Sequence, residues 1–81
     1  MSNSMFLLEV YRIDSFGRTL FKRRISDNPY ALGQWVCDNA QKWAFYAVDV
    51  YCNDECNGTV CLRGDTAPIF EFTISNIAFV M

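Results

Sequence analysis

One segment with helical periodicity, set between segments that alternate with a period of two, constrains the fold of this chain most strongly. Within residues 29–43, Leu32, Val36 and Ala40 recur every fourth residue, which places them on one face of a helix. The preceding residues 26–29 are Ser-Asp-Asn-Pro, a strong helix start, because Asp or Asn accepts hydrogen bonds from the first free N–H groups and proline is favoured at the first helical position. The sequence therefore predicts one amphipathic helix over residues 29–43.

Gly33 falls inside this predicted helix. A glycine in a helix interior costs about 1 kcal/mol relative to alanine, so its presence there asks for a reason. We expect Gly33 to allow a close contact between the helix and the sheet.

The segment before the helix has the pattern of a β-hairpin. Residues 6–13 alternate, with Leu8 and Val10 on one side, which is typical of a half-buried strand. A turn containing Gly17 follows, and a glycine suits the left-handed position of a short hairpin loop. We therefore expect residues 18–26 to return as a second strand beside the first.

The second strand of this hairpin is strongly basic. A regular alternation directs Phe21 and Ile25 inward, and Lys22 and Arg24 outward. Arg23 then shares the inward side and must lie at a rim or edge, where its guanidinium reaches water. We expect this strand to be an edge strand, because charged side chains on edges oppose sheet-to-sheet aggregation.

The segment after the helix predicts three more strands. Residues 45–52 alternate, with Tyr46 and the following even-numbered residues on one side. Residues 59–63 follow an Asn-Gly step and fold back as a hairpin, and residues 69–75 alternate after a second loop. The apolar residues 77–81 are expected either to continue the last strand past a bulge or to pack on the domain.

With 81 residues, the chain has room for one hydrophobic core, so residues 1–81 are expected to form a single domain. The element order ββαβββ predicts an α+β fold, in which a five-stranded, mainly antiparallel sheet carries one helix packed on one face. Within it, residues 6–26 are a basic β-hairpin, residues 29–43 the helix and residues 45–81 a three-stranded acidic C-terminal sheet.

The sheet face without the helix is predicted to be mixed in character. Its residues on this pattern are Tyr11, Ala47, Asp49, Tyr51, Cys61, Glu71 and Thr73. Mixtures of aromatic, acidic and small polar side chains occur on protein-binding faces, and also on ordinary solvated sheets. The sequence leaves both interpretations open.

The net charge of −2 is unevenly distributed along the chain. Residues 1–26 hold five cations and two carboxylates, a net +3, whereas residues 27–81 hold two cations and seven carboxylates, a net −5. The charged candidates for binding nucleic acid are Arg12, Arg18, Lys22, Arg23 and Arg24. The acidic remainder of the chain opposes this use, and solvation of an edge strand is the alternative explanation.

Carboxylates and aromatic residues gather in the C-terminal half. The candidates for a protein-binding surface are Asp49, Tyr51, Asp54, Glu55, Asp65 and Glu71. Clustered carboxylates beside aromatic rings suit a partner with a basic face, because charge steers the approach and the rings supply contact energy. A purely solubilising acidic surface is the competing explanation.

One residue type and one motif on which many enzymes depend are missing. The chain contains no histidine, which removes the commonest general base and the triads built on it. Its four glycines are isolated, so no glycine-rich phosphate loop is present. We therefore expect a protein that is not an enzyme and that needs no cofactor.

Four cysteines leave three states open, namely free thiols, two disulfides or a zinc site. They are Cys37, Cys52, Cys56 and Cys61. The first residues lack a secretory signal, which favours a cytoplasmic protein with free thiols and no bound metal. The C-x3-C-x4-C spacing of the last three cysteines is unlike the tight knuckles of zinc ribbons.

The longest apolar runs of the sequence are too short to cross a membrane.

The leading hypothesis is a small inhibitor or adaptor that blocks a partner protein through its acidic and aromatic surface. In size, acidity and lack of catalytic residues the chain resembles the inhibitor proteins of phages and mobile elements, including anti-CRISPR proteins, and bacterial immunity proteins and antitoxins. The resemblance is one of class and rests on no shared motif; for a phage-encoded protein it implies the host-cell cytoplasm. The alternatives are a nucleic-acid-binding module, a homodimer joined through an edge strand or the apolar C-terminal residues, and a thiol or zinc protein.

Overall fold

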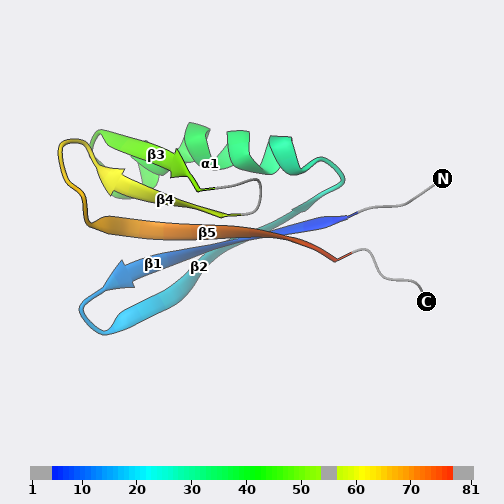
Figure 1. Cartoon of the computed structure of the whole chain (residues 1–81), viewed down its shortest axis with the longest axis horizontal. Helices are drawn as coiled ribbons and strands as arrows, with labels where there is room; N and C mark the ends of the chain where they lie inside the picture. Colours follow the sequence, from blue (N-terminus) through cyan, green and yellow to red (C-terminus); the bar gives the residue numbers. More distant parts are fainter. Residues whose placement is uncertain (1–4, 54–56, 78–81) are drawn as a thin grey trace.

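The computed structural model describes residues 5–53 and 57–77, which form an α+β fold with one sheet and one helix (Figure 1). The elements are β1 (Phe6–Asp14), β2 (Gly17–Ser26), α1 (Pro29–Ala44), β3 (Val48–Cys52), β4 (Asn57–Leu62) and β5 (Pro68–Asn76). All neighbouring strands are antiparallel, in the spatial order β2-β1-β5-β4-β3. The predicted fold class, with five antiparallel strands in the order ββαβββ, is confirmed.

The core lies between α1 and one face of the sheet. The predicted helix stripe of Leu32, Val36 and Ala40 is fully buried. It packs against apolar side chains from three strands, β1, β4 and β5, namely Leu8, Val10, Val60, Phe70, Phe72 and Ile74. Since burying one such side chain contributes about 1.5–3 kcal/mol, this single layer supplies most of the driving force for folding. Among residues 5–53 and 57–77, no helix lies on the other face of the sheet.

Both ends of α1 are capped. The Oδ1 atom of Asn28 accepts a hydrogen bond from the N–H of Tyr30 at 3.0 Å, and Pro29 is the first helical residue, as the sequence predicts. At the other end, Phe45 adopts a left-handed conformation with φ of 62° and donates its N–H to the carbonyl of Gln41. The helix ends there because a left-handed residue cannot continue it.

The expected start of the third strand at residue 45 is wrong. Because α1 runs to Ala44 and Phe45 caps it, the extended backbone begins only at Val48. Tyr46 therefore lies outside the strand, and its side chain is largely exposed rather than inward. Helix capping sets this boundary, and the alternation of side chains alone could not reveal it.

A β-bulge in the first hairpin reverses part of the predicted alternation of β2. The pairing of β1 with β2 shifts by one residue, from Val10 opposite Lys22 to Tyr11 opposite Leu20. Phe21 faces the helix as expected, but the extra residue places the rest of β2 in the opposite phase. The expected inward position of Ile25 and outward position of Lys22 are wrong for this reason.

Beyond the bulge, β2 directs its charged side chains differently from the prediction. Arg24 pairs with the buried Leu8 and so lies on the helix side, whereas Arg23 pairs with Glu9 on the face away from the helix. Ile25 shares that outer face and is more than half exposed.

Within the described ranges, no helix combines the length and the apolar character that crossing a bilayer would require.

Candidate binding surfaces

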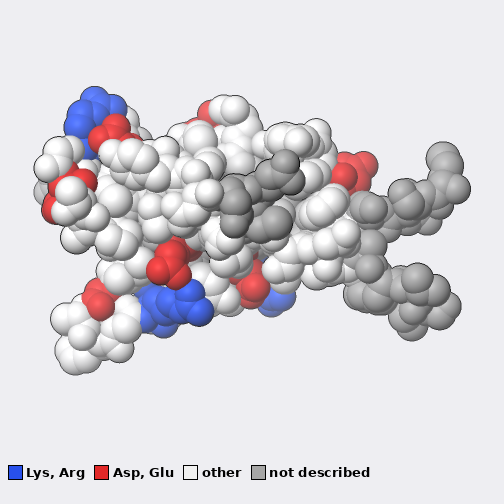
Figure 2. All heavy atoms as spheres, in the orientation of Figure 1, with Lys and Arg blue, Asp and Glu red and all other residues white. Residues whose placement is uncertain are grey.

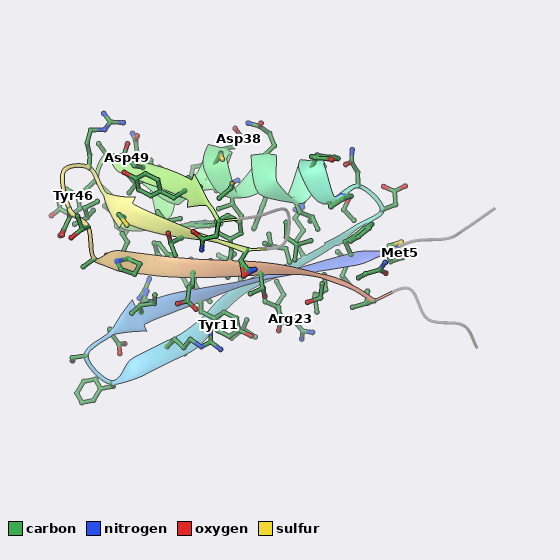
Figure 3. The ribbon with its side chains drawn as sticks, in the orientation of Figure 1. Met5, Tyr11, Arg23, Asp38, Tyr46 and Asp49 are labelled. Carbon is green, nitrogen blue, oxygen red and sulfur yellow. The ribbon has the colours of Figure 1, made fainter. Side chains whose placement is uncertain are left out.

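One row of side chains crosses all five strands on the face of the sheet away from α1. In register, Tyr51 of β3 lies opposite Thr59, Thr59 opposite Glu71, Glu71 opposite Tyr11, and Tyr11 opposite Leu20 of β2. Tyr11 and Asp49 mark this face in Figure 3, whereas Asp38 lies on the helix. We call these five residues the open-face row. Tyr51 and Leu20, at its two ends, are about half exposed.

Two ion pairs fix the charged side chains on the β1 and β2 side of this face. The Arg18 guanidinium lies 2.6 Å from a carboxylate oxygen of Glu71 and 4.7 Å from the ring centroid of Tyr11. Arg23 lies 4.0 Å from Glu9, its cross-strand neighbour. Figure 2 shows basic and acidic atoms side by side over the sheet, so this part of the face has no dominant sign of charge.

At the opposite edge, Asp49 on β3 lies 3.5 Å from Arg63, which follows β4. Arg63 is held there by its backbone, since its N–H donates to the carbonyl of Ala47. Exposed pairs such as these contribute about 0–1 kcal/mol each, so they orient side chains more than they stabilise the fold.

The predicted acidic and aromatic set is brought together only in part. Asp49, Tyr51 and Glu71 lie on the open face in register, and Asp54 and Glu55 lie outside the described residues. The side chain of Asp65 forms hydrogen bonds within its own loop: its Oδ1 atom accepts from the N–H groups of Thr66 and Ala67. Of the other residues predicted for this face, Thr73 and Cys61 share it and Ala47 precedes β3.

The five predicted nucleic-acid-binding cations are divided between the two faces of the sheet. Arg18 and Arg23 are paired with carboxylates on the open face. Arg12, Lys22 and Arg24 lie on the helix side, opposite or beside residues of the core. The sequence placed Arg23 inward and Lys22 and Arg24 outward, and the bulge in β2 reverses these three assignments.

The three helix-side cations rest on aromatic rings. Arg12 lies 4.8 Å and Lys22 5.1 Å from the ring centroid of Phe21, and Arg24 lies 4.9 Å from that of Trp35. These rings belong to an aromatic cluster in which Phe21, Trp35 and Phe70 surround Trp43, with centroid distances of 5.2–6.0 Å. Within the described part of the chain, none of these three cations forms an ion pair with a carboxylate. We call Arg12, Lys22 and Arg24 the basic row.

A groove that the sequence did not reveal lies between the first turns of α1 and the ends of β3 and β5. Its volume is about 520 Å³, and most of its wall is apolar. A Cβ atom on Gly33 would meet no atom within 4 Å, so the expected close contact of Gly33 with the sheet is wrong. Gly33 lines this groove instead, and an unexplained glycine on an amphipathic helix is the signal that could have revealed it.

The three cysteines within the described residues do not all lie at one site. Cys37 and Cys52 line the groove, Cys61 is buried on the other side of the sheet, and Cys56 lies outside the described residues. Burial, followed by the neighbouring Cys52 and Asp38, raises the pKa of the Cys37 thiol. A raised pKa lowers the thiolate fraction, so the environment of Cys37 is unlike that of an activated nucleophile.

Comparison of the sequence with protein-family models finds no match, and comparisons with curated proteins and with solved structures find none either.

Proposed function

We propose that this chain is a non-enzymatic binding protein, an inhibitor or adaptor, which contacts a partner protein through the open-face row. The supporting observation is the row itself: Tyr51, Tyr11 and Leu20 lie on the sheet face opposite α1, which no helix covers in the part of the chain that the structure describes. Tyrosines supply large contact area at a small cost in side-chain entropy, and they are enriched in protein interfaces. Blocking a partner needs nothing more than this contact.

The proposed partner presents basic groups to the β3 end of the row. Tyr51 at that end lies on the same strand as Asp49, and Asp54 and Glu55 follow within four positions along the chain. The surplus of carboxylates in residues 27–81 provides a field that attracts a basic surface. The setting we propose is the cytoplasm. In size and acidity the chain resembles the inhibitor proteins of mobile elements, including anti-CRISPR proteins, and also bacterial immunity proteins and antitoxins.

Affinity capture with paired tyrosine variants tests this proposal. The tagged chain is incubated with a nuclease-treated lysate of the organism that encodes it and washed at low and at moderate salt. We expect a stoichiometric protein on the unmodified chain and on the Tyr46→Ala control, and at least a tenfold loss on Tyr51→Ala. Both side chains are exposed tyrosines, 69% for Tyr46 and 51% for Tyr51, so the pair differs in location rather than in chemistry. Equal capture by the two variants contradicts the proposal.

A second candidate function is binding of single-stranded nucleic acid along the basic row. The observation that favours it is that Arg12, Lys22 and Arg24 share one side of the sheet and lie over aromatic rings. Cations beside aromatic rings suit a phosphate backbone and stacked bases. Its test is the salt dependence of binding to a labelled oligonucleotide: Lys22→Gln with Arg24→Gln reduces the slope, while Arg18→Gln with Arg23→Gln leaves it nearly unchanged. No binding at low salt, or equal effects of the two pairs, contradicts this candidate.

A further inference from the structure

Strand β3 forms one edge of the sheet. Among residues 5–53 and 57–77, only β4 pairs with it, and Figure 1 shows it at the margin of the sheet. Two hydrogen bonds show which of its backbone groups point to β4. The N–H of Arg63 donates to the carbonyl of Ala47, and the N–H of Asn53 donates to the carbonyl of Asn57. Residues 47 and 53, at the two ends of this ladder, therefore belong to hydrogen-bonded pairs.

The backbone groups that β3 does not use for β4 follow from this pairing. In an antiparallel pair, hydrogen-bonded and non-hydrogen-bonded residues alternate, and the register of β3 with β4 is continuous. The N–H and C=O groups of Val48, Val50 and Cys52 therefore point away from β4. Their side chains lie on the helix side, where the two valines pack against the core and Cys52 lines the groove. Such a row of outward N–H and C=O groups is complementary to another extended strand.

The two edges of the sheet differ in how strongly they oppose such pairing. β2 carries four cations and no carboxylate, and a β-bulge interrupts its pairing with β1. Charged side chains and bulges are devices that keep an edge strand from pairing with another chain. β3 has a single charged residue, Asp49, whose carboxylate lies 3.5 Å from the guanidinium of Arg63. Charge therefore opposes self-pairing at β2 and not at β3.

A second copy of β3 fits this edge best in the antiparallel register centred on Val50. Val50 then faces Val50 of the second copy, and Val48 faces Cys52, so all the outward groups pair in about six backbone hydrogen bonds. On the open face, Asp49 stands opposite Tyr51 of the second copy. A register centred on Asp49 would set the two Asp49 carboxylates against each other, where like charges repel, and would leave one end of each strand unpaired.

We propose that two copies of this chain associate through their β3 strands, antiparallel and centred on Val50, so that their two sheets become one continuous sheet. The dimer extends the open-face row, because Asp49 of the second copy stands next to Tyr51. One pair of short strands is smaller than the interface of an obligate dimer, so the association is reversible and depends on concentration. It requires no partner protein, and its test on the purified chain is separate from that of the proposed function.

Disulfide trapping tests the register, with Val50→Cys and Val48→Cys as a matched pair. Both positions are valines of β3 on the helix side, and only residue 50 lies on the proposed two-fold axis. The background variant is Cys37→Ser, Cys52→Ser and Cys56→Ser. Cys61 is retained because it is buried. Oxidised glutathione is the oxidant: it accepts two electrons and two protons from the two thiols and is released as two molecules of reduced glutathione.

The expected result is a covalent dimer of the Val50→Cys variant, at least tenfold more abundant than that of the Val48→Cys variant. Residues paired on the axis have Cα atoms about 5.5 Å apart, within the range of about 4.4–6.8 Å that a disulfide requires. Restoring Cys52 gives Val48→Cys a thiol directly opposite in the second copy, so its cross-linking should return. Equal cross-linking of the two variants in the serine background, or none by either, overturns the proposal.

Analytical ultracentrifugation gives a second test without cross-linking. The N–H of Val50 is not used in the ladder with β4, so Val50→Pro removes hydrogen bonds from the dimer and none from the hairpin. We expect the unmodified chain and the Val50→Ile control to shift from monomer to dimer as concentration rises. The dissociation constant of Val50→Pro should be at least tenfold weaker.

Far-UV circular dichroism checks that Val50→Pro keeps its fold. The trapping pair, which retains every backbone donor, decides the question where Val50→Pro does not fold. An unmodified chain that stays monomeric up to millimolar concentration overturns the proposal, as do equal dissociation constants for the folded Val50→Pro and Val50→Ile variants.

Discussion

Replacing two glycines by alanine should change stability in opposite directions. Gly58 on β4 lies next to the ring of Phe72. A Cβ atom added to Gly58 would lie 2.6 Å from Cε1 of Phe72 and 2.7 Å from the backbone oxygen of Tyr51. The ring of Phe72 borders the groove, but the Tyr51 oxygen belongs to the backbone of the paired strand, so the added methyl group requires the strands to shift. At Gly33 the same methyl group meets open space and removes the helix penalty of glycine.

The magnitudes follow from these surroundings. Overpacking costs about 1–3 kcal/mol, of which about 0.5–1 kcal/mol is offset by removing a glycine from a strand, so Gly58→Ala should lose about 1 kcal/mol. Gly33→Ala should gain about 1 kcal/mol. Urea unfolding measures both, and with a slope near 1 kcal/mol per M the midpoint should fall by about 1 M for Gly58→Ala and rise by about 1 M for Gly33→Ala. A change of the same sign at both positions would refute the assignment of Gly58 to a contact and Gly33 to a groove.

Three further predictions concern the helix and the groove. Phe45→Gly should raise the free energy of unfolding by about 1 kcal/mol in urea titrations, since Phe45 is 86% exposed and has positive φ; a loss of stability would show that its side chain packs. Leu32→Ala, at a fully buried position, should cost about 2–5 kcal/mol, and a cost below 1 kcal/mol would place α1 elsewhere. The raised pKa of Cys37 should make its iodoacetamide reaction at pH 8 slower than that of free cysteine, with the rate continuing to rise at more alkaline pH; a faster reaction contradicts this.

Local signals in the sequence predicted the elements of this fold. The cap of α1 follows from Asn28 and Pro29, and the buried stripe of Leu32, Val36 and Ala40 follows from the helical repeat. These features depend on neighbours only a few residues apart, which is why spacing alone identifies them. The strand alternation was equally informative wherever β pairing was regular.

Features that depend on the register between strands were not predictable in the same way. One extra residue at Phe21 moved Arg24 to the helix side, where it stacks on Trp35, and moved Ile25 to the open face. No residue type near Phe21 signals this bulge. The pairing of Glu71 with Arg18 depends likewise on a contact across 53 positions of the chain. The alternation of side chains therefore placed Tyr51 and Glu71 on the open face, but it could not predict the ion pair between Glu71 and Arg18.

The groove illustrates a further limit of sequence patterns. Gly33 was expected to mark a contact, whereas it marks an opening. Both uses require a missing side chain, and the sequence does not distinguish them. Only the positions of Phe72 and Ile74 on β5, opposite the helix, decide which applies.

The most direct test of the central claim is the dissociation constant of the captured partner for two single variants, Tyr51→Ala and Tyr46→Ala, measured by calorimetry. Binding through the open-face row predicts at least a tenfold weaker constant for Tyr51→Ala, because an interface aromatic residue commonly contributes about 1.4 kcal/mol or more. It predicts a change of less than twofold for Tyr46→Ala. An unchanged constant for Tyr51→Ala, or a larger loss for Tyr46→Ala, would contradict the assignment of the binding surface to the open face of the sheet.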